Sequence, residues 1–150
     1  MPSKTSKQEK PYRIARGILD FDVYGYRVTF VFTNDLQRAR DEYDSVIGHH
    51  LEHAGAGAFH STVDWATDPR SFLFFPLDAC SEYIAHESAH VIFRMFRWAG
   101  IEFNERETGE NFAYHLGHLV ANITSAQRKL VPERFRRIYV KRRKAKRAVL

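Results

Sequence analysis

The chain has very little cysteine and no long apolar run. Cys80 is the single cysteine among 150 residues, so an internal disulfide and a cysteine-rich zinc site are both excluded. Such low cysteine use suits a reducing compartment, and we expect Cys80 to be a buried helix residue. No stretch of about 18 apolar residues occurs, so no membrane-spanning helix is expected.

The start of the chain lacks the apolar segment of a secretory signal peptide. Residues 1–10 are polar and basic. We therefore expect a cytoplasmic protein, or one packaged from the cytoplasm. Internal repeats and low-complexity segments are also missing from the sequence.

Composition indicates one domain, whereas charge is distributed unevenly. A chain of 150 residues with 44% hydrophobic and 14% aromatic content can bury one ordinary core. Residues 128–150 hold 11 Lys or Arg against one Glu, and residues 1–16 hold 5 against one. Residues 17–127 hold 7 basic against 16 acidic side chains. The predicted organisation is a basic N-terminal arm (1–16), an acidic central domain (17–127) and a basic C-terminal helix or tail (128–150).

The basic run from Arg128 to Arg147 predicts a partner of opposite charge. Its side chains can neutralise nucleic-acid phosphates, with an affinity that falls steeply as salt rises, or dock on an acidic protein. Pairing with the acidic body of the same chain is an equal alternative. Aromatic interleaving and a recognisable nucleic-acid fold are both missing, so base reading is not expected.

Hydrophobic periodicity predicts an α+β domain. Four segments have the pattern of strands, namely 12–22, 26–33, 57–64 and 71–75. Four have the pattern of helices, namely 34–46, 78–99, 108–123 and a short one after Pro132. The first two strands should form a hairpin at Tyr24-Gly25, and Asn34 or Asp35 should cap the first helix. We expect a small, mostly antiparallel sheet packed against helix 78–99 and the helix that follows it.

The predicted helix 78–99 contains a motif that indicates a particular chemistry, His86-Glu87-Ser88-Ala89-His90. Because a helix turns once in about 3.6 residues, His86 and His90 project from one face and can bind one Zn²⁺. Glu87 is then adjacent and free to act as a general base on water that the metal acidifies. This combination is the machinery of amide hydrolysis. The alternative is two ordinary helix histidines without a metal.

A third ligand is expected from the next helix. Glu110 opens the sequence Glu-Asn-Phe-Ala, and the small residues Ala113 and Gly117 follow it, which predicts a close approach to helix 78–99. Glu107 competes with Glu110, although it also fits a capping box that begins at Asn104. If Glu110 is not the ligand, His118 is the next candidate.

Other residues near the motif have two interpretations each. Tyr114 can aim its hydroxyl at a developing oxyanion, or it can be a packing residue. A second group of histidines falls in a glycine-rich segment, namely His49, His50, His53 and His60. They can close over the site, bind a second metal or be solvated loop residues.

The motif His86-Glu87-x-x-His90 with Glu110-x-x-Ala113-Tyr114 resembles the gluzincin group of zinc metallopeptidases. Within that group it is most similar to the small, minimal zincin-like proteins encoded by phages and prophages. The resemblance covers about residues 70–125. It implies His86, His90 and Glu110 as zinc ligands and Glu87 as base, with a strand beside the cleft that pairs with extended peptide substrate. It implies no particular substrate.

The expected function is therefore zinc-dependent hydrolysis of a peptide bond. Two alternatives stay open. One is a virion or assembly protein that keeps a zincin fold without turnover, and the other is a nucleic-acid-associated protein that uses its basic tail.

Overall fold

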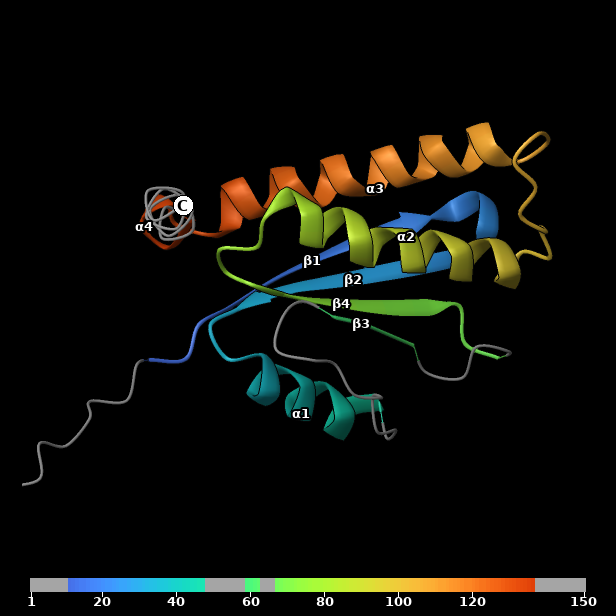
Figure 1. The fold of residues 1–150 in the computed structure, drawn as a ribbon. Helices are drawn as coiled ribbons and strands as arrows, with labels where there is room; N and C mark the ends of the chain where they lie inside the picture. Colours follow the sequence, from blue (N-terminus) through green and yellow to red (C-terminus); the bar gives the residue numbers. More distant parts are fainter. Residues whose placement is uncertain (1–10, 48–58, 63–66, 137–150) are drawn as a thin grey trace, which may run out of the picture.

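The computed structural model describes residues 11–47, 59–62 and 67–136, which form a sheet covered by helices on both faces (Figure 1). The elements are β1 (Ile14–Phe21), η1 (Asp22–Tyr24), β2 (Tyr26–Thr33), α1 (Leu36–Ile47), β3 (Phe59–Thr62), β4 (Arg70–Pro76), α2 (Ser81–Trp98), α3 (Gly109–Leu130) and α4 (Glu133–Arg136). The predicted α+β class is confirmed.

The sheet has the strand order β1-β2-β4-β3. β1 pairs antiparallel with β2, β2 pairs parallel with β4, and β4 pairs antiparallel with β3. The sheet is therefore mostly antiparallel, as predicted. β2 and β4 are parallel because α1 and β3 lie between them in the chain and return it to the starting end of the sheet. β1 and β3 are the edge strands.

The hairpin predicted at Tyr24-Gly25 is confirmed. β1 and β2 pair from Ile14 opposite Thr33 to Phe21 opposite Tyr26. Gly25 ends η1 with a φ of 57°, a left-handed conformation that glycine adopts without steric cost.

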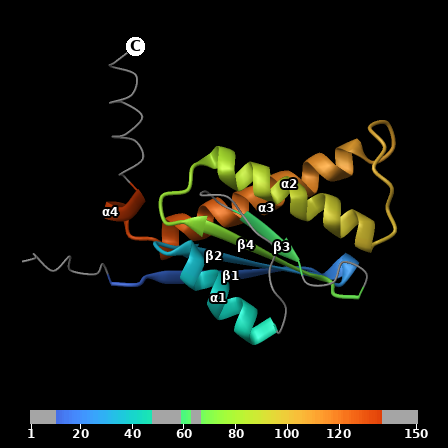
Figure 2. The same cartoon turned by 60° about the horizontal axis from the view of Figure 1, so that its bottom comes forward.

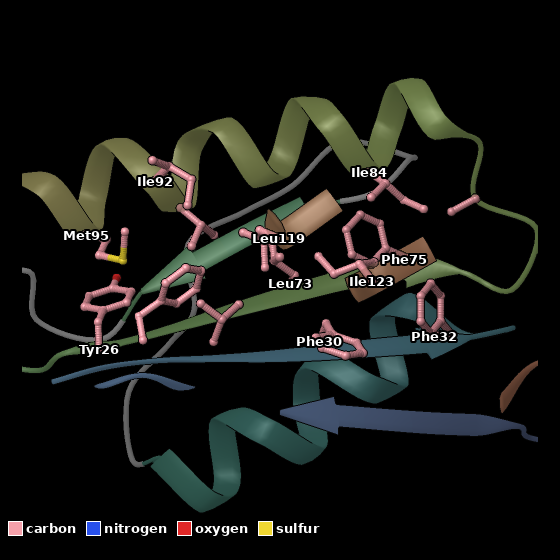
Figure 3. Close-up of a cluster of buried hydrophobic side chains, with 14 of the residues drawn as sticks. Tyr26, Phe30, Phe32, Leu73, Phe75, Ile84, Ile92, Met95, Leu119 and Ile123 are labelled. Atoms are coloured by element: carbon pink, nitrogen blue, oxygen red, sulfur yellow. The ribbon is translucent and has the colours of Figure 1, made fainter. Parts of the chain in front are cut away.

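The main core lies between the sheet and the helices α2 and α3. Figure 3 shows Tyr26 and Met95 at one end of this core and Phe75 and Ile84 at the other. Tyr26 is 1% exposed, and its hydroxyl shares a 2.6 Å hydrogen bond with the hydroxyl of Ser71. This bond supplies the partner that a buried hydroxyl needs, and burial raises the pKa of Tyr26.

A smaller core lies on the opposite face, under α1 (Figure 2). As predicted, α1 turns Leu36, Ala39 and Tyr43 toward the sheet. Its N-cap is Asp35, whose Oδ1 accepts a 3.0 Å hydrogen bond from the backbone N–H of Arg38.

The start of α2 differs from the prediction. The helix begins at Ser81 rather than at residue 78, because the preceding connection is held by long-range hydrogen bonds. Gln127 Nε2 donates to the carbonyl oxygens of Leu77 and Ala79, at 3.2 and 3.0 Å. Cys80 is consequently the N-cap residue and half-buried, so its prediction as a buried helix residue is wrong.

Both predicted domain boundaries fall inside regular elements. The boundary between residues 16 and 17 lies within β1, and that between residues 127 and 128 lies within α3. α3 extends to Leu130 rather than stopping near residue 123, because Gln127 and Val131 are still buried.

The prediction that Ala113 and Gly117 allow a close helix approach is wrong. Both residues are exposed, and an added Cβ at Gly117 would meet no atom within 4 Å. Gly17 of β1 is the opposite case, because an added Cβ there would collide with the ring of Phe30.

Two glycine substitutions test this difference. Gly117→Ala should raise the free energy of unfolding by about 0.5–1 kcal/mol, because glycine costs helix stability and nothing opposes the new methyl group. Gly17→Ala should lower it by about 1–3 kcal/mol, because the buried Phe30 ring must move. Urea unfolding of both variants and the wild type measures the two effects. If both substitutions changed the free energy of unfolding by the same amount, the described difference between the surroundings of Gly17 and Gly117 would be wrong.

Candidate metal centre

His86 and His90 lie one turn apart on the outer surface of α2. The helix forms here because Ile84, Val91 and Met95 supply an apolar face that packs on the sheet. The two histidines fall outside that face, and 68% of the His86 side chain is exposed. Their Nε2 atoms are 3.3 Å apart, and their ring centroids are 4.9 Å apart.

This separation suits two ligands of one zinc ion. Zinc–nitrogen bonds of about 2.0–2.1 Å at a tetrahedral angle place the two nitrogens about 3.3 Å from each other. The 3.3 Å distance between the Nε2 atoms of His86 and His90 therefore matches the spacing of two ligands on one tetrahedral zinc ion. Neutral imidazole is also a preferred donor for zinc.

Glu87 stands beside the pair in a more sheltered position. Its Oε1 is 4.0 Å from Nε2 of His86, and only 12% of its side chain is exposed. Glu87 shares a flank of α2 with Arg94, two turns later, whose Nη2 donates to the carbonyl oxygen of Asp68 at 3.1 Å. Asp68 lies two residues before β4, so Arg94 reaches the start of that strand.

Glu110 does not join this group. α3 runs antiparallel to α2, and Phe112 in its first turn packs on Phe93 and Phe96, with centroid separations of 4.5 and 6.1 Å. Because a helix rises about 1.5 Å per residue, His86 lies about 10–15 Å along α2 from the residues that carry those two rings, and His90 lies about 5–9 Å from them. Among the side chains that the structure describes, no three of His, Cys, Asp and Glu could hold a metal ion. The assignment of Glu110 as third ligand stays a prediction.

The start of α3 differs from the capping box proposed for Glu107. Thr108 is the N-cap by position, as predicted, but its side chain makes no cap hydrogen bond. Its Oγ1 instead donates to the carbonyl oxygen of Asn104 at 3.0 Å. Asn104 and Glu107 precede the helix in a turn, where Glu107 is exposed.

Tyr114 and His118 lie on the outer side of α3. Tyr114 is 71% exposed, so its interpretation as a packing residue is wrong, while its role at an oxyanion stays a prediction. His118 contacts the ring of Phe21 on β1, 6.0 Å away, and Asn122 on its own helix. His118 therefore faces the β1 side of α3.

The structure also shows a partly buried hydrogen-bonded pair, Tyr24 and His115, that the sequence did not predict. The Tyr24 hydroxyl and His115 Nε2 are 3.0 Å apart, although the residues are 91 positions apart in the chain. The His115 ring also packs against Phe21 and Phe96. Burial lowers the pKa of His115, and repulsion from His118 adds to this effect. Only the packing of α3 on the hairpin creates the pair, so no local pattern could have predicted it.

The histidines of the glycine-rich segment are the remaining candidates from the sequence. His49, His50 and His53 lie outside the described residues. The backbone of His60 is part of β3, opposite Leu73 of β4.

Two hollows of the described surface lie away from the histidine pair. One of about 360 Å³ is lined by charged residues of the hairpin and of β4, including Asp20, Arg27 and Arg70. Another of about 300 Å³ lies between β1 and α3. The residues that line these two hollows do not include any of α2.

The resemblance implies a strand that pairs with extended peptide substrate, and the strands at 57–64 and 71–75 are the two candidates for it, now β3 and β4. β4 has neighbours on both sides, β2 and β3, so its hydrogen-bonding groups are used within the sheet. β3 is an edge strand, and α2 approaches it closely. Among the described strands, β3 thus has a neighbour on one side only, which is the arrangement that strand addition requires.

The fold and the site define an α+β protein with a paired histidine site on a surface helix. Comparison with protein-family models, with curated proteins and with solved structures finds no match for this chain. Among the described helices, none is both long and apolar enough to cross a membrane.

His115 should make stability depend on pH. Its pKa is lowered in the folded state, so the unfolded chain binds more protons below the ordinary pKa of 6.5. The free energy of unfolding should therefore be fully retained above about pH 6.5 and fall as the pH drops below that value. Urea unfolding between pH 7.5 and 5 measures the slope.

His115→Phe should flatten this slope, because the group that titrates is gone while ring packing is kept. His118→Gln should keep most of it, since burial is the larger cause of the lowered pKa. A slope unchanged in His115→Phe would show that another group is responsible.

Proposed function

We propose that the protein is a zinc-dependent metallopeptidase with a minimal zincin-like domain, of the kind encoded by phages. The observation that carries this proposal is the 3.3 Å separation of His86 and His90 Nε2 on an exposed helix face, with the Glu87 carboxylate beside them. Two imidazoles at this separation match two tetrahedral zinc ligands. The motif supplies both a metal-binding pair and a base.

Each residue has a distinct role in this function. Bound zinc would polarise a peptide carbonyl and acidify water at the site. Glu87 accepts the proton from the attacking water and returns it to the leaving amine. Its limited exposure, 12%, reduces solvation of the carboxylate. His86 and His90 would be the metal donors, and the backbone of α2 holds them one turn apart.

The edge position of β3 supports a peptide substrate. An extended chain can add to an open strand edge through backbone hydrogen bonds, which are independent of side-chain identity. α2 lies close to β3, so a peptide paired there would pass alongside the helix that carries Glu87.

The carboxylate of Glu87 can be tested separately from metal binding. Glu87→Gln should retain one equivalent of zinc and lose peptide hydrolysis by about 10²–10⁴-fold, because the amide cannot accept the proton. Glu82→Gln makes the same change in the first turn of the same helix and should alter neither property. Metal content and cleavage of an unfolded protein substrate are the two measurements.

The outcomes separate the alternatives. A wild-type protein that takes up no zinc, even after reconstitution, would contradict the proposal. Zinc uptake without hydrolysis in any preparation would favour a zincin fold that has lost turnover.

A further inference from the structure

β1 is an edge strand with an exposed apolar side chain near its middle. Among the described strands, β1 pairs only with β2, and its eight residues form an uninterrupted ladder with that neighbour. Ile18, near the middle of β1, is 61% exposed. The outer row of backbone N–H and C=O groups of an edge strand is a template for pairing with another chain. This edge is therefore a candidate for strand addition.

The hydrogen-bond pattern shows which residues of β1 present their backbone groups at the edge. On β2, the backbone N–H of Arg27 donates to the carbonyl oxygen of Pro69 at 2.9 Å, away from β1. Asp20 is opposite Arg27, so its own backbone groups point away from β2. Because these directions alternate along an antiparallel pair, the backbone groups of Arg16 and Ile18 also point outward.

The side chains of these three outward residues are positive, apolar and negative in turn. They lie on the face of the sheet that α1 covers, where Arg16 Nη2 donates to Glu42 Oε2 at 3.5 Å. Asp20 Oδ1 accepts a 2.7 Å hydrogen bond from Nε of Arg27. Both ion pairs are exposed, and a carboxylate has about four acceptor positions, so Asp20 can accept from a second guanidinium.

The other face of β1 borders a hollow of about 300 Å³ between the strand and α3. Its lining includes Gly17, Leu19 and Phe30, together with residues of α3 from Asn122 to Leu130. The ring of Phe30 lies against Gly17, which has no side chain of its own, so this part of the lining is apolar. Strand addition is specific where such a hollow takes a side chain of the added strand.

One antiparallel register of two β1 strands satisfies both faces. When Ile18 stands opposite Ile18 of the partner subunit, Arg16 stands opposite Asp20 of the partner subunit, and symmetry repeats this pair. On the other face, Leu19 of the partner subunit stands opposite Gly17, beside the hollow. Registers that oppose Arg16 to itself, or Asp20 to itself, bring like charges together and are destabilised.

We propose that the protein forms a two-fold symmetric dimer in which β1 pairs antiparallel with β1 of a second copy. The sheet is then continuous across the two subunits, and each contributes the same surface, as a two-fold interface requires. The occupant of the edge is a second copy because the charge pattern of β1 complements itself when the strand is reversed. This inference is independent of the zinc centre, which lies on α2.

Charge variants of the full-length protein test the dimer by sedimentation equilibrium. The wild type should have a mass of about twice the 17.5 kDa of one chain, falling on dilution. Arg16→Asp makes the edge negative throughout and Asp20→Arg makes it positive throughout, so each variant alone should be a monomer. An equimolar mixture of the two should form heterodimers. Arg106→Asp, the same change in the exposed connection before α3, should dimerise like the wild type.

Each contrary result overturns the proposal. A wild type that stays monomeric throughout the micromolar range would show that the edge does not pair with itself. A dimer that both charge variants retain would place the interface on another surface. Two variants that are folded by circular dichroism but stay monomeric when mixed would rule out the pairing of Arg16 with Asp20.

Cysteine cross-linking tests the register without a change of charge at the two-fold axis. In a Cys80→Ser background, Ile18→Cys should form a disulfide-linked dimer on mild oxidation, since Cα atoms of a hydrogen-bonded pair are about 5.5 Å apart. Arg16→Cys should not, because the two substituted positions would stand about 14 Å apart along the strands. Cross-linking of Arg16→Cys, or none of Ile18→Cys, would contradict the proposed register.

Discussion

The burial of one face of α2 against the sheet is the constraint on which the rest of the structure depends. Ile84, Ile92 and Met95 are each at most 1% exposed, and side chains of this size contribute about 1.5–3 kcal/mol each when buried. With these residues turned inward, the helical period leaves His86 and His90 on the outer surface. The interaction that stabilises the fold therefore also orients the candidate metal centre.

Polar contacts determine where α2 stands along the sheet. Arg94 bonds to the carbonyl oxygen of Asp68 near one end of the helix, and Gln127 of α3 bonds to the carbonyl oxygens of the connection before its other end. Each of these hydrogen bonds gives a carbonyl oxygen a partner in place of the water that burial removes. Apolar packing alone permits sliding, whereas directional bonds do not.

Sequence patterns predicted those features that depend on neighbouring residues. The bounds of β2, the turn at Gly25, the Asp35 cap and the amphipathic helix under the histidine motif were all available from local periodicity. The predicted start of α2 was wrong because Gln127, which is far away in the chain, forms hydrogen bonds with the residues before Cys80. The predicted close approach of two helices at Ala113 and Gly117 was wrong, because small residues permit such an approach without requiring it.

The sequence by itself determined the chemistry of the candidate centre, since the spacing of His86 and His90 and the helical period together place two imidazoles on one turn. Only the tertiary structure decided what surrounds them. The order of the strands puts β3 beside β4, the bond between Tyr24 and His115 joins the hairpin to α3, and the packing of α3 on α2 sets Phe112 against Phe93. These relations join residues far apart in the chain, and they depend on which surfaces bury together, which no local pattern encodes.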